Sequence, residues 1–280
     1  MIVSELINFG SRTLKKNNIL THVIDSELIL SKVLGKSREH VLTSFDKDVT
    51  KKNIIKFNSI LKQRLKNEPM AYILKEKEFW DKKFLVDRNT LIPRPETELL
   101  VEKLINFFKK KRLTFMDIGT GSGCIALILL QEIKNSRATC VDISRKAVKV
   151  AVKNATNLGL INRCNFYNRS FEEIYNKKFD LIVSNPPYIC SHQIKNLSKD
   201  IKKFEPRLAL DGGNDGLDVV RKIIYKSKTI LKLKGILALE IGTGQYKKVS
   251  QILKLQGFKE ESLIKDYKDN IRCVLTKLEN

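Results

Sequence analysis

Hydrophobic positions in the first quarter of the chain recur at intervals of three and four residues. Ile2, Leu6 and Phe9 begin this pattern, and it continues through residues 24–34 and 51–66. Such spacing places the apolar side chains on one face of a helix. Residues 1–69 are therefore predicted to form a small bundle of three helices.

The expected helices have recognisable ends. Asp25 is a candidate cap for the start of the second helix, and Gly35 can end it, because glycine readily adopts the left-handed conformation found after helices. Glu68 and Pro69 end the third helix, since proline is poorly accommodated in a helix interior.

The pattern changes between residues 70 and 94. Short apolar runs at residues 71–74 and 84–86 flank a turn, and their aromatic and branched side chains favour strands. We therefore expect a β-hairpin connector over residues 70–94. Pro93 and Pro95 then interrupt the chain before a helix expected over residues 96–109.

Apolar strands alternate with amphipathic helices from residue 113 onward. The expected strands cover residues 113–118, 138–142, 179–184, 235–241 and 271–276, and the expected helices cover residues 123–132, 145–158 and 216–231. Alternation of this kind predicts an α/β domain with a mostly parallel sheet and helices on both faces. We assign this domain to residues 95–280.

Composition excludes several classes of protein. Hydrophobic residues make up 42% of the chain and charged residues 30%, which is typical of a globular protein. No apolar run approaches the roughly 18–20 residues that a membrane helix requires. The first ten residues also lack the basic and apolar regions of a secretory signal. We expect a cytoplasmic protein.

The net charge of +22 raises the possibility of a nucleic-acid partner. The lysine excess is spread along the chain, so a general compositional bias explains it as well as a binding face does. We do not expect direct nucleic-acid binding, although the charge is compatible with an RNA-rich partner. The five cysteines and three histidines are scattered, and we therefore expect no metal site.

A glycine-rich turn follows the strand at residues 113–118. It consists of Gly119, Thr120, Gly121, Ser122 and Gly123. Glycines let the backbone approach a ligand closely, and the start of the following helix offers free N–H groups. The turn alone is weak evidence, because it could equally bind a dinucleotide or no ligand at all.

Two acidic residues sharpen this interpretation. Asp142 ends the next expected strand, where its carboxylate can accept hydrogen bonds from both hydroxyl groups of a ribose. Asp117 precedes the glycines, and its charge would oppose a pyrophosphate but suits the positive charges of S-adenosylmethionine. S-adenosylmethionine is therefore favoured over NAD.

The strand at residues 179–184 leads directly into Asn185, Pro186, Pro187 and Tyr188. The two prolines stiffen the backbone and remove two N–H donors. The Asn185 side-chain oxygen and the Pro186 carbonyl can then each accept one N–H of a planar NH₂ group, while Tyr188 stacks beside it. Positioning and electrostatics would supply most of the rate, without a strong base.

Three further segments carry a family resemblance. They read TLIPRPETE at residues 90–98, FEPRLALDGG at residues 204–213 and EKEFW at residues 76–80. With Asn185-Pro-Pro-Tyr188, the chain resembles, over nearly its whole length, the methyltransferases that modify a glutamine of peptide chain release factors. Lys75 and Asp81 depart from the glycines usual in that family, which affects the expected hairpin turn.

The resemblance implies a Rossmann-like, seven-stranded class I methyltransferase domain. It implies methyl transfer from S-adenosylmethionine to N5 of the glutamine in a Gly-Gly-Gln loop, with a helical N-terminal domain gripping the release factor. Residues 119–123, Asp142 and Asn185 would bind the donor, and Ser170 or Phe171 would line its adenine pocket. We expect a monomer.

Two other functions remain open from the sequence. Asn185-Pro-Pro-Tyr188 also occurs in methyltransferases that modify the N6 atom of adenine in DNA or RNA, although no added target-recognition region is evident. A donor-binding protein without activity, acting as an RNA- or ribosome-binding module, is the third hypothesis. The intact Asn185 argues against that last one.

Overall fold

The computed structural model describes residues 1–109 and 111–279. They divide into two compact units, Met1–Lys75 with Ser198–Phe204, and Glu76–Leu197 with Glu205–Asn280. Among the described residues, no helix combines the length and apolar character needed to cross a membrane.

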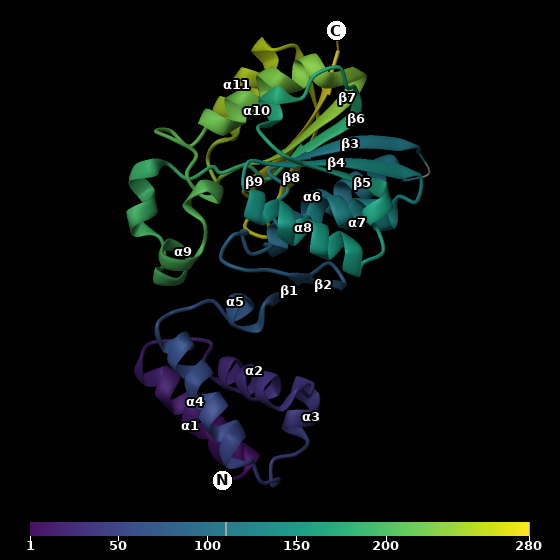
Figure 1. Ribbon diagram of the computed structural model, residues 1–280. Helices are drawn as coiled ribbons and strands as arrows, with labels where there is room; N and C mark the ends of the chain where they lie inside the picture. The colour runs from purple at the N-terminus through teal and green to yellow at the C-terminus, as the bar shows by residue number, and fades with distance from the viewer. Residues whose placement is uncertain (110, 280) are drawn as a thin grey trace. The chain divides into compact units, whose positions relative to one another are not determined.

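The first unit is a helical bundle (Figure 1). The bundle consists of α1 (Val3–Lys16), α2 (His22–Leu34), α3 (Arg38–Leu42), α4 (Lys51–Leu65) and α5 (Met70–Leu74). The short helix α9 (Lys199–Phe204) is assigned to the same unit. The apolar stripes predicted from the sequence meet in one core, which includes the fully buried side chains Leu6, Leu14, Ile29, Leu30 and Phe57. This burial supplies the main driving force for helices that would be marginal in isolation.

The two ends of α2 differ in how well the sequence predicted them. The helix ends at Gly35, whose φ of 63° is left-handed as expected. The predicted cap at Asp25 is wrong, because the helix already begins at His22. Asp25 instead accepts hydrogen bonds from Thr21 Oγ1 and from Arg64 Nε of α4, each at 2.7 Å. Its carboxylate therefore joins two helices that are distant in sequence.

The predicted strand at residues 71–74 is also wrong. These residues belong to helix α5, which starts directly after Pro69 and buries Tyr72 and Ile73. An apolar run of four residues carries no periodicity that separates strand from helix. The hairpin lies further on, where β1 (Glu76–Phe79) pairs with β2 (Lys82–Leu85) in antiparallel register.

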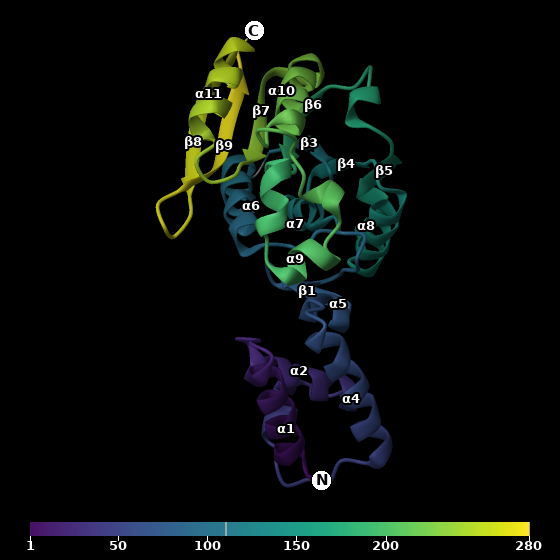
Figure 2. The same cartoon turned by 90° about the vertical axis from the view of Figure 1, so that its left-hand side faces the viewer.

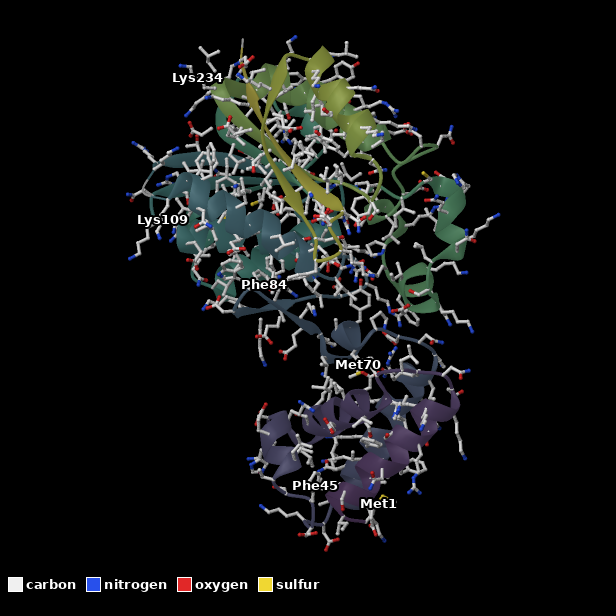
Figure 3. All side chains as sticks on the ribbon, turned by 180° about the vertical axis from the view of Figure 1, so that it is seen from behind. Met1, Phe45, Met70, Phe84, Lys109 and Lys234 are labelled. Atoms are coloured by element: carbon white, nitrogen blue, oxygen red, sulfur yellow. The ribbon has the colours of Figure 1, made fainter. Side chains whose placement is uncertain are left out.

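Left-handed backbone at two non-glycine residues shapes the hairpin. Lys75 has a φ of 64° and Trp80 a φ of 61°, so the strained turn position falls on Trp80 rather than on Asp81. The rings of Phe79 and Phe84 pack edge to face, 6.1 Å apart, and Figure 3 labels Phe84 on this hairpin. Glu98 Oε1 accepts a 2.8 Å hydrogen bond from Trp80 N, which ties the hairpin to helix α6 (Pro95–Phe108).

A seven-stranded sheet forms the centre of the second unit (Figure 2). Its strands are β3 (Leu113–Ile118), β4 (Ser136–Asp142), β5 (Cys164–Asn168), β6 (Phe179–Ser184), β7 (Leu231–Glu240), β8 (Phe258–Lys265) and β9 (Ile271–Leu278). Their order is β5-β4-β3-β6-β7-β9-β8. Neighbouring strands run parallel except where β9 pairs with β7 and β8, which confirms the predicted α/β class and the mostly parallel sheet.

The sequence did not predict the two edge strands, β5 and β8. Both are only partly buried, so their sequences lack the continuous apolar run that marks a central parallel strand. Pairing with β4 and β9 defines them. Helix α11 (Tyr246–Leu255), which precedes β8, was likewise not predicted.

Helices cover both faces of the sheet. One group consists of α6 (Pro95–Phe108), α7 (Cys124–Glu132) and α8 (Arg145–Asn157), and the other of α10 (Asp218–Ile230) and α11 (Figures 1 and 2). Short 3-10 helices cover Ile161–Arg163, Phe171–Glu173, Ser191–Asn196 and Arg207–Ala209. The chain runs outward from β3 in one direction and from β6 in the other. In open α/β sheets, such a reversal opens a crevice at the carboxyl ends of the strands.

Gly10 tests the packing of the helical bundle. A Cβ atom at this position would lie 2.6 Å from the ring of Phe57 and closer still to Ser26 Oγ. Replacing a helical glycine by alanine usually stabilises by about 0.5–1 kcal/mol. Here we expect Gly10→Ala to lower the free energy of unfolding by about 1–3 kcal/mol, because the core is overpacked. Urea denaturation measures the effect.

Arg12→Ala provides the control, because Arg12 is exposed on the same helix. This substitution should change the free energy of unfolding by no more than about 0.5 kcal/mol. A Gly10→Ala protein as stable as the wild type would contradict the close packing described here.

Candidate active site

A cavity of about 300 Å³ opens at the carboxyl ends of β3, β4 and β6. This volume lies at the lower end of the range of small-molecule pockets. The residues that line it include Arg88–Leu91 and Thr97, the glycine turn Gly119–Ser122, Asp142–Ser144 after β4, Phe171, Ser184–Pro187 after β6, and Pro206 with Leu208. The fold therefore brings the predicted glycine turn, Asp142 and Asn185 to one cavity.

The glycine turn needs its glycines for conformational reasons. Gly119, Gly121 and Gly123 have φ values of 71°, 57° and 82°. Residues other than glycine adopt such values only with strain. A Cβ atom on Gly123 would also lie 3.3 Å from Ala151 Cβ, so this glycine lets α7 pack closely on α8. Asn154 supports the turn by donating a 2.8 Å hydrogen bond to Ser122 O.

Asp142 extends from the end of β4 towards the same turn. Its Oδ2 accepts a 3.0 Å hydrogen bond from Gly121 N, and its Oδ1 accepts one of 2.8 Å from Ser144 N. Burial raises the pKa of this carboxyl above its usual value, and the two N–H donors oppose that rise. The carboxylate is thus oriented at the cavity wall, where ribose hydroxyl groups could reach it.

Asp117, a buried residue of β3, supports the glycine turn through a hydrogen bond. It is 1% exposed and does not belong to the cavity lining, so the expected direct match to the charges of the donor is not evident. Thr120 Oγ1 donates a 2.7 Å hydrogen bond to Asp117 Oδ2, whereas Oδ1 accepts none from any described residue. Burial is the main cause that raises the pKa of Asp117 to about 7.

The two candidates for the adenine pocket differ in position. Phe171 lines the cavity beside Arg169. Ser170 is absent from the lining, and its Oγ accepts a 3.2 Å hydrogen bond from Glu172 N at the start of a short helix. Gly123 and Tyr188 are also absent from the described lining.

The tetrapeptide Asn185–Tyr188 begins where β6 ends. Ser184 Oγ donates a 2.7 Å hydrogen bond to Ile118 O, which joins the ends of β6 and β3. Asn185, Pro186 and Pro187 line the cavity. Within the described chain, neither Asn185 Oδ1 nor Pro186 O accepts a hydrogen bond. Two acceptors are therefore left for a ligand.

Tyr188 is held from two sides and remains a neutral phenol. Arg272 Nη2 donates a 3.2 Å hydrogen bond to Tyr188 Oη, and Gln245 Nε2 donates one of 2.9 Å to Tyr188 O. Burial, followed by the nearby Glu240 carboxylate, raises the pKa of Tyr188 to about 12. Its hydroxyl group therefore keeps its proton at neutral pH.

The sequence did not predict the polar side chains that contact Asn185 within the protein. Asn185 Nδ2 donates a 3.1 Å hydrogen bond to Thr97 Oγ1, which donates one of 2.6 Å to Glu240 Oε2. Burial raises the pKa of Glu240 to about 7, although Thr97, Arg272 and Asn185 lower it. Thr97 lies in the segment TLIPRPETE, but no motif marked Glu240 or Arg272.

An ion pair with a buried carboxylate joins the segments at residues 90–98 and 204–213. Arg94 Nη2 lies 2.6 Å from Glu205 Oε1, and Ile92 N donates a 3.3 Å hydrogen bond to Glu205 Oε2. The Glu205 side chain is 1% exposed. Removing one partner of such a pair leaves an uncompensated buried charge, so this contact holds the two segments together.

Known proteins resemble this chain over most of its length. Residues 95–261 match the methyltransferase small domain family, and residues 5–74 match the PrmC N-terminal domain. A release factor glutamine methyltransferase from Buchnera aphidicola subsp. Acyrthosiphon pisum is 39% identical over 92% of this chain and 94% of its own length. The chain belongs to the release factor glutamine methyltransferase family.

One further relative agrees with this family, and one solved structure shares the fold. The release factor glutamine methyltransferase of Clostridium acetobutylicum is 36% identical, covering 94% of this chain and 93% of its own. The crystal structure of a ribosomal protein L11 methylase from Lactobacillus delbrueckii subsp. bulgaricus shares the fold, with a TM-score of 0.51, 21% identity and coverage of 67% of this chain and 81% of its own. The enzyme is therefore a methyltransferase that uses S-adenosylmethionine, and the cavity's glycine turn and Asp142 suit that donor.

Asp117 gives the stability of this enzyme a defined dependence on pH. The folded protein raises the pKa of Asp117 from 3.8 to about 7, so it binds the proton more tightly than the unfolded chain does. The wild type should therefore lose stability relative to Asp117→Asn as the pH rises from about 4 to about 7. The difference should grow by roughly 1.4 kcal/mol per pH unit and then level off.

Thermal and urea unfolding of both proteins across this pH range, without donor, measures the difference. Asp46→Asn is the control, because Asp46 is exposed, and its difference from the wild type should not vary in this way. Parallel stability curves for the wild type and Asp117→Asn would contradict the buried carboxyl group.

Proposed function

We propose that the enzyme transfers a methyl group from S-adenosylmethionine to the side-chain amide N5 of the glutamine in the Gly-Gly-Gln motif of peptide chain release factors. The observation that carries this proposal is the pair of unoccupied acceptors, Asn185 Oδ1 and Pro186 O, at the edge of the cavity. A primary amide has two N–H donors in one plane, which match two such acceptors. The family of the chain supports the same substrate.

The chemical difficulty is that an amide nitrogen is a poor nucleophile, because its lone pair is delocalised into the carbonyl group. Two acceptors that bind both N–H groups would fix the plane of the amide and increase the electron density on nitrogen. The bound donor supplies an electrophilic methyl group. The protein contributes orientation and electrostatic stabilisation, which are the largest sources of rate in many enzymes.

Among the described residues, neither Tyr188 nor Glu240 is suited to remove a proton from the substrate before transfer. Tyr188 is a neutral phenol that accepts a hydrogen bond from Arg272. Glu240 is fully buried and accepts a hydrogen bond from the Thr97 hydroxyl group. We infer that the amide proton leaves to solvent after the methyl group has been transferred.

We assign donor binding to residues 119–123, Asp142, Phe171 and Asn185. Asp142 would accept hydrogen bonds from the ribose hydroxyl groups, while Phe171 would pack against the adenine. Ser170, which caps a short helix, would then act through the loop that carries Phe171. Asn185 would contact both the donor and the substrate.

We further propose that the helical unit helps to bind the release factor, in line with its match to the PrmC N-terminal domain. The division into domains 1–69, 70–94 and 95–280 stays a prediction beside the two observed units. A monomer acting in the cytoplasm, where release factors function, fits this role. The comparisons do not favour adenine methylation.

The activity can be tested with a purified release factor and isotopically labelled S-adenosylmethionine. We expect one methyl group on the peptide that contains Gly-Gly-Gln, detected by mass spectrometry. A release factor carrying Gly-Gly-Ala should incorporate none. Label that persists in the Gly-Gly-Ala protein, or that appears in added DNA or RNA, would refute the proposal.

Asn185→Ala removes one of the two proposed acceptors. We expect the turnover number to fall by about 10²–10³-fold, as is typical when one transition-state contact is lost. The affinity for the release factor should change less. Steady-state kinetics measure both quantities.

Asn157→Ala is the matched control, because Asn157 is exposed at the end of α8. It should retain wild-type turnover. Unchanged turnover in Asn185→Ala would remove Asn185 from the mechanism.

A further inference from the structure

The proposed role of Asn185 depends on which end of its amide faces the substrate. The oxygen and nitrogen of an asparagine side chain have nearly the same shape, so packing alone hardly distinguishes the two orientations. The oxygen would accept an N–H of the glutamine, whereas the nitrogen would present a donor to a donor. The site therefore needs a group that selects one orientation.

The fold places three polar side chains in a row behind the tetrapeptide. Register pairs Ser184 with Leu239, so the next residues, Asn185 and Glu240, emerge from adjacent strand ends. Thr97 lies in the first turn of α6, which begins at Pro95. We call Glu240, Thr97 and Asn185 the carboxylate–hydroxyl–amide chain.

While Glu240 is ionised, each hydrogen bond in this chain can run in one direction only. An ionised carboxylate accepts and cannot donate, so the single hydroxyl proton of Thr97 must point to Glu240 Oε2, 2.6 Å away. Thr97 Oγ1 is then left as an acceptor for Asn185 Nδ2, at 3.1 Å. Asn185 Oδ1 consequently remains on the cavity side.

Burial opposes ionisation of Glu240 and raises its pKa to about 7, whereas the Thr97 hydroxyl group and Arg272 favour the carboxylate. Arg272 Nη2 lies 3.9 Å from Glu240 Oε1. The same guanidinium group donates to Tyr188 Oη. Glu240 is thus connected to both ends of the tetrapeptide, to Asn185 through Thr97 and to Tyr188 through Arg272.

We propose that Glu240, acting through Thr97, fixes the orientation of the Asn185 amide and so keeps its oxygen towards the substrate. Glu240 and Thr97 are then positioning residues, because each would act through Asn185 and not directly on the reacting nitrogen. This inference rests on the proposed methylation of an amide. It adds Glu240 and Thr97 to the residues of the proposed mechanism, and both would orient Asn185 before the substrate binds.

Thr97→Val tests the inference, because valine keeps the shape of threonine and removes the hydroxyl group. We expect the turnover number to fall about tenfold, which corresponds to the loss of one buried hydrogen bond. The Michaelis constant for the release factor and the dissociation constant for S-adenosylmethionine should stay within about twofold of the wild type. Thr97→Ser restores the hydroxyl group and should restore most of the turnover.

Thr276→Val is the matched control. Thr276 is equally buried in the same unit, but its hydroxyl donates to Leu237 O within the sheet. This substitution should leave the turnover number unchanged. Thermal unfolding of all three variants shows whether a change in turnover merely follows a change in stability.

Glu240→Gln tests the direction of the hydrogen bonds. A glutamine at this position can donate to Thr97 Oγ1, which frees the Thr97 proton to point towards Asn185. We expect a drop in turnover similar to that of Thr97→Val. The double variant should be little worse than either single variant, because both disrupt one chain.

Side-chain ¹⁵N–¹H NMR of Asn185 reports on the carboxylate–hydroxyl–amide chain without requiring turnover. The signal is assigned by its loss in Asn185→Ala. The NH₂ protons of Asn185 should be protected from exchange in the wild type and Thr97→Ser, but not in Thr97→Val. Equal protection in all three proteins, or equal loss of turnover in Thr97→Ser and Thr97→Val, would overturn the inference. A wild-type enzyme that does not methylate release factors would reject the proposed function, while the NMR result would still decide the orientation.

Discussion

A buried carboxylate at the end of β7 constrains the geometry of the tetrapeptide. Glu240 is inaccessible to solvent, and a charge in such a place is tolerated only when protein groups replace its water. Thr97 donates a hydrogen bond to Glu240 Oε2, and Arg272 lies 3.9 Å from Oε1, which accepts no hydrogen bond from any described residue. Thr97 and Arg272 each also contact the tetrapeptide. The groups that surround the Glu240 carboxylate therefore also fix Asn185 and Tyr188, the residues proposed to hold the substrate.

The sheet supplies the frame for this arrangement. Parallel strands place the ends of β3, β4, β6 and β7 along one edge, and the reversal of strand order between β3 and β6 leaves a crevice there. The glycine turn follows β3, Asp142 ends β4, and Asn185 follows β6. The site for S-adenosylmethionine and the site for the substrate amide can therefore lie side by side without a long loop to bring them together.

Two carboxyl groups, Asp117 and Glu240, are buried under the two halves of the cavity, and both have a raised pKa of about 7. Each supports a segment that lines the cavity, Asp117 through Thr120 and Glu240 through Thr97. Burying such groups costs stability at neutral pH. The enzyme thus accepts a local loss of stability where its backbone must be held in a set position.

The sequence alone determined the helical first unit, the parallel sheet, the glycine turn, Asp142 and the tetrapeptide, because periodicity and short motifs are local properties. It misassigned residues 71–74 and missed the partly buried edge strands, since a short or polar segment takes its form from its neighbours. Only the tertiary structure decided the roles of Glu240 and Arg272. They lie 55 or more positions from Asn185 in the chain, and a hydrogen bond between distant segments leaves no pattern in the sequence until the strands are paired.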